Sequence, residues 1–513
     1  MVRKREWAVF LLFLFAAALI MLVMTTSSPL YPTNPWGDVQ CYMTVARGMD
    51  AGLMPYRDLM EHKGPLLYFV HYLAVQVSPD GFLGVYLLET LACAAFLFAG
   101  YRILRLLKFR AEYCIPLLIA LAALLAASEA FLYGDSAEEM CTPLLAWSLY
   151  EALRYFLNDR KMSRACLLRN GVLAGCVFWI KYSLLGLHFA WMAVIAIDCV
   201  IQDRKIWRAL KMCALFLAGM ALASLPWLIY YAVNGALKDL IQVYIVENLT
   251  GYRKNVGVVY GILRGNYRGF RRNPAMGLAL VAAGVSVLFS KRLPWRAKIC
   301  ALAMMACVGT FAYFSGQQYM YMFYAWACVT PLALIPLLNL IQWLEARRLL
   351  LARVGVAVTA AIACCAAVLN TNMLPRIGYP EEKLVQSVFA DVINQTENPT
   401  LLNCGFLDGG FYAAADVLPS TRWFQGYNID QMECYRIHKG IIENEEVDYV
   451  VTRNFTLEEL GIDGSAYALV MSMKDEYAIY GPELTYHLYR SSALDGAAQQ
   501  SGQAEAEPQL PLY

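Results

Sequence analysis

About eleven long apolar runs constrain the fold of this chain more than any other feature. Crossing the hydrocarbon core of a bilayer takes about 20 apolar residues of helix, and a helix satisfies its own backbone polar groups where water is absent. The runs therefore predict a mainly α-helical, polytopic membrane protein with about 11 transmembrane helices. They lie near residues 7–24, 81–101, 113–132, 140–157, 171–183, 184–201, 212–233, 274–290, 298–314, 321–343 and 354–370.

Basic loops between these runs predict the orientation of the chain. Lys and Arg favour the cytoplasmic side of a membrane, and Arg3, Lys4 and Arg5 precede the first run. We therefore expect a protein of the plasma (cytoplasmic) membrane with a cytoplasmic N-terminus, whose first run is retained as an anchor instead of being cleaved as a signal peptide. The net charge is only +2, which gives no reason to expect a nucleic-acid partner. The further basic loops are RILRLLKFR, NDRKMSR, QDRKIWRALK, KRLPWRAK and EARRLLLAR.

The sequence changes character after about residue 371, where the apolar runs become short. TLLNCGF and DYVVTRN are typical of buried strands. We predict a transmembrane domain over 1–370 with its first outer loop at 25–80, an extracytoplasmic α/β domain over 371–492, and a disordered tail over 493–513. Cys404 and Cys434 fall in the outer domain, where they could pair as a disulfide.

The first outer loop holds several ionisable residues between two apolar neighbours. Such groups cost free energy near a bilayer unless they are paired or bind something. Asp38 stands at the start of a segment whose apolar positions fall on one helical face. It could simply cap that helix, or it could act as a general base that takes a proton from an acceptor hydroxyl or amine.

Glu61, His62 and Lys63 precede Gly64 and Pro65 in the same loop. Pro65 suits the first turn of a helix, so Lys63 would lie at a helix N-terminus, where a cation and free N–H groups favour a phosphate. An ion pair between Lys63 and Glu61 is the simpler interpretation. His62 could orient a ligand or bind a metal. The apolar helix that follows is too short to cross a membrane.

A second acidic group, Glu138 and Glu139, follows Gly134, Asp135 and Ser136 at the outer end of the third run. Ser136 with Glu139 matches a capping box, which would explain Glu139 structurally. Both carboxylates would also face the same water layer as the first outer loop, where they could serve acid–base or metal-assisted transfer. No cofactor is certain from these residues, and a divalent metal held by His62 and Glu139 stays open.

Two further segments suit substrate binding. The outer loop 234–272 is basic against the orientation rule, and Arg253 and Lys254 in it could bind a phosphate or lipid headgroups. An interfacial helix with snorkelling side chains would explain it equally well. Tyr319 and Tyr324 could hydrogen-bond a sugar or belong to an aromatic belt, and Lys181 could contact a phosphate, although snorkelling is the simpler interpretation.

The pattern GD…Y…A…G…PY.D…HKGPLLY in the first outer loop resembles the GT-C class of integral-membrane glycosyltransferases. More narrowly it is similar to the bacterial relatives of the protein O-mannosyltransferases and to the lipid A aminoarabinose transferases. The resemblance implies a polyprenyl-phosphate-linked sugar donor, a catalytic role for Asp38, and contact between Lys63 and the donor phosphate. His62 departs from the acidic residue of the aminoarabinose branch, and Val39 departs from the adjacent Asp-Glu pair of the mannosyltransferases.

We therefore expect an enzyme that transfers a sugar to a glycan, lipid or protein of the cell envelope by a single inverting displacement. Glu138 or Glu139 would position the acceptor or a cation. A transporter or flippase for lipid-linked polysaccharide is the alternative, although its ionisable residues would sit at mid-membrane instead of at the outer edge. A non-catalytic envelope scaffold is the third hypothesis.

Overall fold

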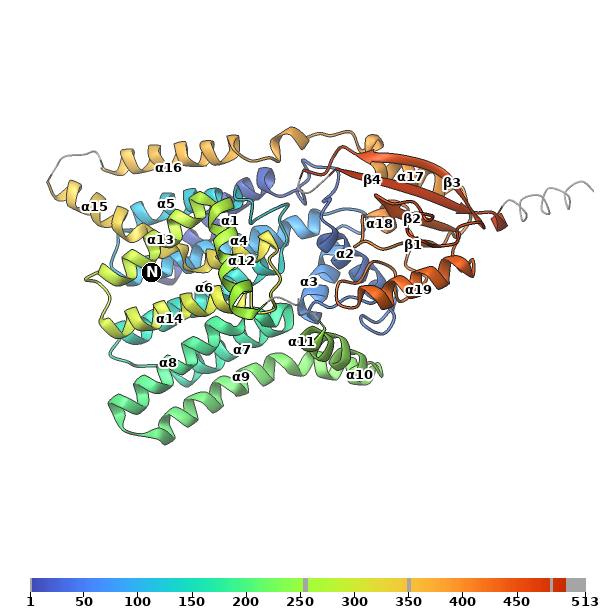
Figure 1. The fold of residues 1–513 in the computed structure, drawn as a ribbon. Coiled ribbons are helices and arrows are strands. Elements are labelled where there is room, and N and C mark those ends of the chain that lie inside the picture. The colour runs from blue at the N-terminus through green and yellow to red at the C-terminus, as the bar shows by residue number, and fades with distance from the viewer. Residues whose placement is uncertain (1, 252–256, 348–351, 480–482, 495–513) are drawn as a thin grey trace, which may run out of the picture. The chain divides into compact units, whose positions relative to one another are not determined.

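The computed structural model in Figure 1 describes residues 2–251, 257–347, 352–479 and 483–494. The chain forms two compact units, each assembled from separate stretches of sequence. The first unit comprises residues 1–34, 63–237 and 252–377, and the second comprises 35–62, 238–251 and 378–513. The units therefore differ from the continuous segments that the sequence predicted. Half of the first outer loop, residues 35–62, belongs with the C-terminal residues.

The described part of the first unit is built from helices. Its elements are α1 (Val2–Met24), α3 (Pro65–Val77), α4 (Leu83–Leu106), α5 (Ala111–Ala126), α6 (Ala137–Leu157), α7 (Arg164–Lys181), η1 (Tyr182–Leu185), α8 (Gly186–Asp203), α9 (Ile206–Val233), α12 (Val258–Arg272), α13 (Pro274–Phe289), α14 (Trp295–Phe311), η3 (Met320–Leu334), α15 (Ile335–Ala346), α16 (Ala352–Leu369) and η4 (Leu374–Arg376). A short helix, α10 (Leu237–Asp239), spans the boundary between the units.

Helices occupy all of the predicted apolar runs, as the sequence led us to expect. Among the described residues, five helical stretches are long and apolar enough to cross a membrane, and a bent pair, α12 with α13, would make six. The helices α3 and α5 and residues 353–369 of α16 are apolar but shorter. The predicted count of about 11 crossings is therefore not confirmed, while the mainly helical fold class is.

One apolar stretch, residues 164–203, turns back on itself. Arg160, just before α7, makes contacts of 2.7 Å with Asp198 and 3.2 Å with Asp203, both near the end of α8. Because an 18-residue helix is about 27 Å long, these contacts require α7 and α8 to run in opposite directions. The tight turn expected near residues 181–183 is formed by η1.

The second unit combines helices with a four-stranded sheet of order β1-β2-β4-β3. β1 pairs with β2 in parallel, whereas β4 pairs antiparallel with both β2 and β3. The first two strands are the segments predicted from TLLNCGF and DYVVTRN. The elements are α2 (Gly37–Asp50), η2 (Leu240–Glu247), α11 (Asn248–Thr250), η5 (Glu381–Lys383), α17 (Val385–Ile393), β1 (Leu401–Asn403), α18 (Phe411–Ala414), α19 (Gln431–Glu443), β2 (Tyr449–Arg453), β3 (Tyr467–Asp475) and β4 (Leu484–Ser491).

Helices cover both faces of this sheet, with α17 and α19 on opposite sides (Figure 1). On one face Ile442 of α19 packs in a cluster with Val450 and Tyr489. On the other, Tyr486 packs edge-on against Phe411 of α18, with 5.0 Å between ring centroids. The alternation of side chains along β4 accounts for the two faces. Cys404 and Cys434 are buried free thiols in the structure. The expected tail lies, apart from residues 493 and 494, outside the described residues.

Candidate functional site

Asp38 lies in the first turn of α2 in the second unit, and it does not cap the helix. The N-cap position is Trp36, whose side chain makes no capping hydrogen bond. The Asp38 side chain is only 7% exposed, and the Tyr42 hydroxyl donates to its Oδ2 at 3.4 Å. The capping interpretation is therefore wrong. What remains is a buried carboxylate one helical turn from a phenol.

The helix α2 is held by a residue that the sequence did not single out, Asp408. The Thr44 hydroxyl donates to Asp408 Oδ2 at 2.6 Å, and the Gly410 N–H donates to Oδ1 at 2.8 Å. Asn403 adds a donor at 3.2 Å. A Cβ on Gly37 would lie 3.1 Å from the Asp408 carbonyl oxygen, which explains the glycine before Asp38. Burial raises the pKa of the Asp408 carboxyl.

Three carboxylates surround the Cys41 thiol in the interior of this unit. Burial raises the pKa of Cys41, and the negative charges of Asp408, Glu61 and Asp38 raise it further, in that order. The thiol donates to the side-chain oxygen of Gln425. Asp38 and Glu61 therefore share one buried, acidic environment, as far as the described residues show. A low dielectric there strengthens every interaction with charge.

Glu61 and His62 are fixed from two distant parts of the chain. His62 Nδ1 lies 3.3 Å from Glu61 Oε1, and the Asn248 amide donates to the His62 carbonyl oxygen at 2.8 Å. The ring of Tyr427 meets the His62 ring edge-on at 5.8 Å. The Tyr427 hydroxyl in turn donates to Glu247 at 2.8 Å, and burial raises the pKa of this tyrosine.

Lys63 begins the second of the three stretches that make up the first unit, and it is 8% exposed. Pro65 occupies the first turn of α3, as predicted. The Lys63 N–H donates to the Tyr68 hydroxyl at 2.9 Å, and the Gly64 N–H donates to the Ile180 carbonyl at 3.2 Å. These two N–H groups are therefore engaged, and the predicted anion site rests on the ammonium group more than on backbone donors.

Glu138 forms a buried ion pair with Lys181. The Lys181 Nζ lies 2.5 Å from Glu138 Oε1 and 4.9 Å from the centroid of the Tyr321 ring. Tyr319 stacks on Tyr321 at 5.6 Å and 7°. Lys181 therefore does not snorkel, and Glu138 does not face open water, contrary to the sequence interpretation. Lys181 follows Ile180, the residue against which Gly64 packs.

Glu139 points into a separate buried network, although it neighbours Glu138. Its N–H donates to the Ser136 hydroxyl at 3.0 Å, so the predicted cap is present. Its carboxylate accepts from the Asp135 N–H at 2.8 Å, and Glu89 accepts from the same N–H at 2.9 Å. Asp135 also bonds His71 at 2.7 Å. The Glu139 carboxylate therefore has a structural role in this network. Glu89, Asp135 and His71 were not among the site residues predicted from the sequence.

The remaining predicted residues differ in how far they are buried, and two of them are not described by the structure. Tyr324 is buried against Phe131, with 5.4 Å between ring centroids, and borders a small cavity of about 10 Å³ that Glu139 also lines. Tyr319 is 37% exposed. Arg253 and Lys254 lie outside the described residues. No group of three or more His, Cys, Asp and Glu in the described ranges is arranged to hold a metal ion.

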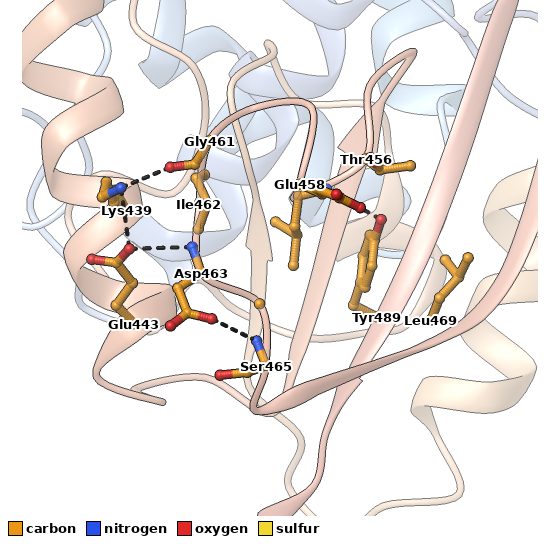
Figure 2. A pocket seen from close by; sticks show the side chains of 12 residues that line it. Lys439, Glu443, Thr456, Glu458, Gly461, Ile462, Asp463, Ser465, Leu469 and Tyr489 are labelled. Atoms are coloured by element: carbon orange, nitrogen blue, oxygen red, sulfur yellow. Dashed lines mark hydrogen bonds and ion pairs between the residues drawn. The ribbon is translucent and has the colours of Figure 1, made fainter.

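The residues that line a groove of about 620 Å³ in the second unit include none of the predicted site residues (Figure 2). Its polar atoms bond to one another. Lys439 donates to the Gly461 carbonyl at 2.7 Å and lies 3.2 Å from Glu443, which accepts from the Asp463 N–H at 3.2 Å. Because these groups satisfy one another, the groove adds no group to the candidate site.

No family model matches the sequence, and no curated protein matches it. The structure resembles ArnT from Cupriavidus metallidurans bound to undecaprenyl phosphate, with a TM-score of 0.55 and 14% identity over 93% of this chain and 97% of that chain. For apo ArnT the TM-score is 0.54 and the identity 13%, over 95% and 98%. For the arabinofuranosyltransferase AftD from Mycobacteria, the TM-score is 0.49 and the identity 14%, over 93% and 41%.

The likeness to ArnT covers almost the whole of both chains, so it establishes the fold. The GT-C-type fold that the first-loop resemblance implied is thereby confirmed. The chain is an integral membrane protein with a mainly helical body and a small C-terminal sheet.

Proposed function

We propose that this protein is a membrane glycosyltransferase that moves a sugar from a polyprenyl-phosphate donor to an acceptor of the cell envelope at the outer face of the membrane. One observation carries the proposal. The protein shares its fold, across nearly its whole length, with ArnT, whose structure holds undecaprenyl phosphate. The acceptor is a glycan, a lipid or a protein, and the N-terminus is cytoplasmic.

Asp38 is the general base in this proposal. Its carboxylate takes the proton of the acceptor hydroxyl or amine, and the acceptor atom then attacks the anomeric carbon of the donor. The bond between that carbon and the phosphate oxygen breaks, and the electron pair leaves with the polyprenyl phosphate. The attack comes from the face opposite the leaving group, so the configuration inverts.

Lys63 stabilises the leaving phosphate, because a fixed cation in a water-poor site lowers the energy of a developing negative charge. Arg253 and Lys254 assist it. Glu138, held by Lys181, positions the acceptor, and Tyr319 contacts the sugar. Glu61 and His62 keep the first-loop backbone in place before Lys63. Glu139 and Tyr324 support the site from within the helices rather than touching substrate.

The test begins with binding of undecaprenyl phosphate to the full-length protein, measured as thermal stabilisation at constant detergent. We expect stabilisation of the wild type, its loss in Lys63→Ala, and no change in Lys205→Ala, a matched lysine that is exposed. No stabilisation of the wild type would refute the polyprenyl-phosphate donor.

A second measurement follows donor consumption by Asp38→Asn, which keeps the side-chain shape and removes the base. A loss of about 100-fold or more is expected for removal of a general base. If the variant consumes donor at nearly the wild-type rate while binding it normally, Asp38 is not the base.

A further inference from the structure

A stripe of glycines fixes the helix α12 closely against its neighbours in the first unit. A Cβ on Gly265 would lie 2.4 Å from the Tyr313 ring, and one on Gly269 would lie 2.2 Å from the Phe323 ring. At Gly261 the nearest atom is the Cα of Gly316, at 2.9 Å. Residues four apart share one helical face, so α12 presents this face inward and its other face outward.

The outward face of α12 forms an open groove of about 620 Å³. Tyr260, Leu263 and Tyr267 are 53%, 66% and 65% exposed. The lining residues recur at the spacing of one helical face. They are Tyr260, Leu263, Arg264, Tyr267, Arg268 and Arg271.

Three arginines on this face have no acidic partner among the described residues. Arg264 donates to the Tyr260 hydroxyl at 2.7 Å, and Arg268 reaches only an amide oxygen, at 3.5 Å. Arg271 is exposed. Arg272, one residue further round the helix, is by contrast paired with Glu129 at 2.8 Å. The face therefore concentrates positive charge that no acidic residue in the described part of the chain neutralises.

The position of α12 suits the boundary of a bilayer. It joins α13, an apolar helix, through a bend of 114°. If α13 runs through the hydrocarbon core, this bend turns α12 along the membrane surface. A helix there places arginines among lipid headgroups and leucine and tyrosine at the acyl boundary.

We propose that this face of α12 binds the phosphate headgroup of an anionic phospholipid of the bilayer. The guanidinium groups of Arg264, Arg268 and Arg271 pair with the phosphate oxygens, while Leu263 and the two tyrosines contact the start of the acyl chains. The groove is open, its leucine and tyrosine side chains are more than half exposed and its arginines are exposed, whereas Lys63 is 8% exposed. An open surface fits an abundant lipid, and a buried lysine fits a specific donor.

The test compares the wild type with R264Q/R268Q/R271Q. The full-length protein in detergent is titrated with short-chain phosphatidylglycerol, and in parallel with phosphatidylcholine. The measured quantity is the lipid concentration that gives half of the maximal thermal stabilisation. Each arginine near such a surface changes affinity roughly fivefold. The triple variant should therefore need on the order of 100-fold more phosphatidylglycerol for half-maximal stabilisation. Phosphatidylcholine should affect the wild type and the triple variant equally.

A matched control, R164Q/K205Q/K211Q, removes three exposed charges that have no acidic partner among the described residues. It should respond to phosphatidylglycerol as the wild type does. Equal responses in all three proteins, or no response in the wild type, would overturn the proposal. So would a triple variant that keeps the response to phosphatidylglycerol and loses the response to undecaprenyl phosphate, because the groove would then serve the donor.

Discussion

Replacing Asp408 with alanine should destabilise the packing of α2, the helix that carries the proposed base. The substitution leaves three donors, the Thr44 hydroxyl, the Asn403 amide and the Gly410 N–H, without their acceptor. A buried donor without a partner costs about 1–3 kcal/mol. Part of this is offset, because the carboxylate itself is costly to bury. We therefore expect a loss of about 3–6 kcal/mol, a large part of the stability of an ordinary domain.

The assay is thermal unfolding of the purified protein, together with hydrogen–deuterium exchange of the α2 amides. For a domain of this size, each kcal/mol shifts the midpoint by about 2–4 °C, so the Asp408→Ala midpoint should fall by on the order of 10 °C. Exchange within α2 should accelerate before exchange in the sheet does. The matched control is Asp391→Ala, an exposed position on α17, with an expected effect within about 0.5 kcal/mol. Equal midpoints for the two variants would refute the role given to Asp408.

Three other substitutions follow from the same contacts. Glu138→Gln leaves the buried Lys181 charge unpaired and should lower the free energy of unfolding by about 3–5 kcal/mol. Adding Lys181→Met should restore most of that stability, because it removes the unpaired charge. An unaltered thermal midpoint in the single variant would contradict the ion pair. His438 Nδ1 accepts from the Gly405 N–H at 3.2 Å while Nε2 bonds the Trp423 carbonyl at 2.8 Å, and burial lowers its pKa from 6.5 to about 4. The unfolded chain then binds a proton that the folded chain does not, so stability should fall by roughly 3 kcal/mol as the pH drops from 6.5 to 4, and His438→Gln should flatten that pH profile. Gly265→Ala should cost about 1–3 kcal/mol by overpacking against Tyr313, whereas Gly284→Ala, with nothing within 4 Å of the added Cβ, should be neutral or stabilising.

Features set by local sequence were predictable. The apolar runs gave the helix positions, because hydrophobic length alone identifies a helix in lipid. Pro65 marked the start of α3, and Ser136 capped α6 as its spacing from Glu139 required. Each of these signals is contained within a few residues, so no knowledge of the tertiary structure was needed.

The pairings that organise the candidate site were not predictable, because they join residues far apart in sequence. Thr44 and Asp408 are separated by 364 positions, and Glu138 and Lys181 by 43. A buried lysine and a snorkelling lysine look the same in sequence, and only the opposing carboxylate distinguishes them. The pairing of Asp135 with His71 was likewise hidden, since one lies in the loop before α6 and the other within an apolar helix.

The clearest difference between expectation and structure concerns α2. The sequence placed its apolar positions on one helical face, which is the pattern of a helix with a single buried side. In the structure residues 38–46 and 48 are all buried, because residues 238–251 and the C-terminal part of the chain belong to the same unit. Polar side chains on α2 therefore have to find partners within the protein, as Thr44 does with Asp408. It follows that a substitution in α2 changes folding and activity together, and that loss of turnover identifies Asp38 as the base only where unfolding and donor binding are unchanged.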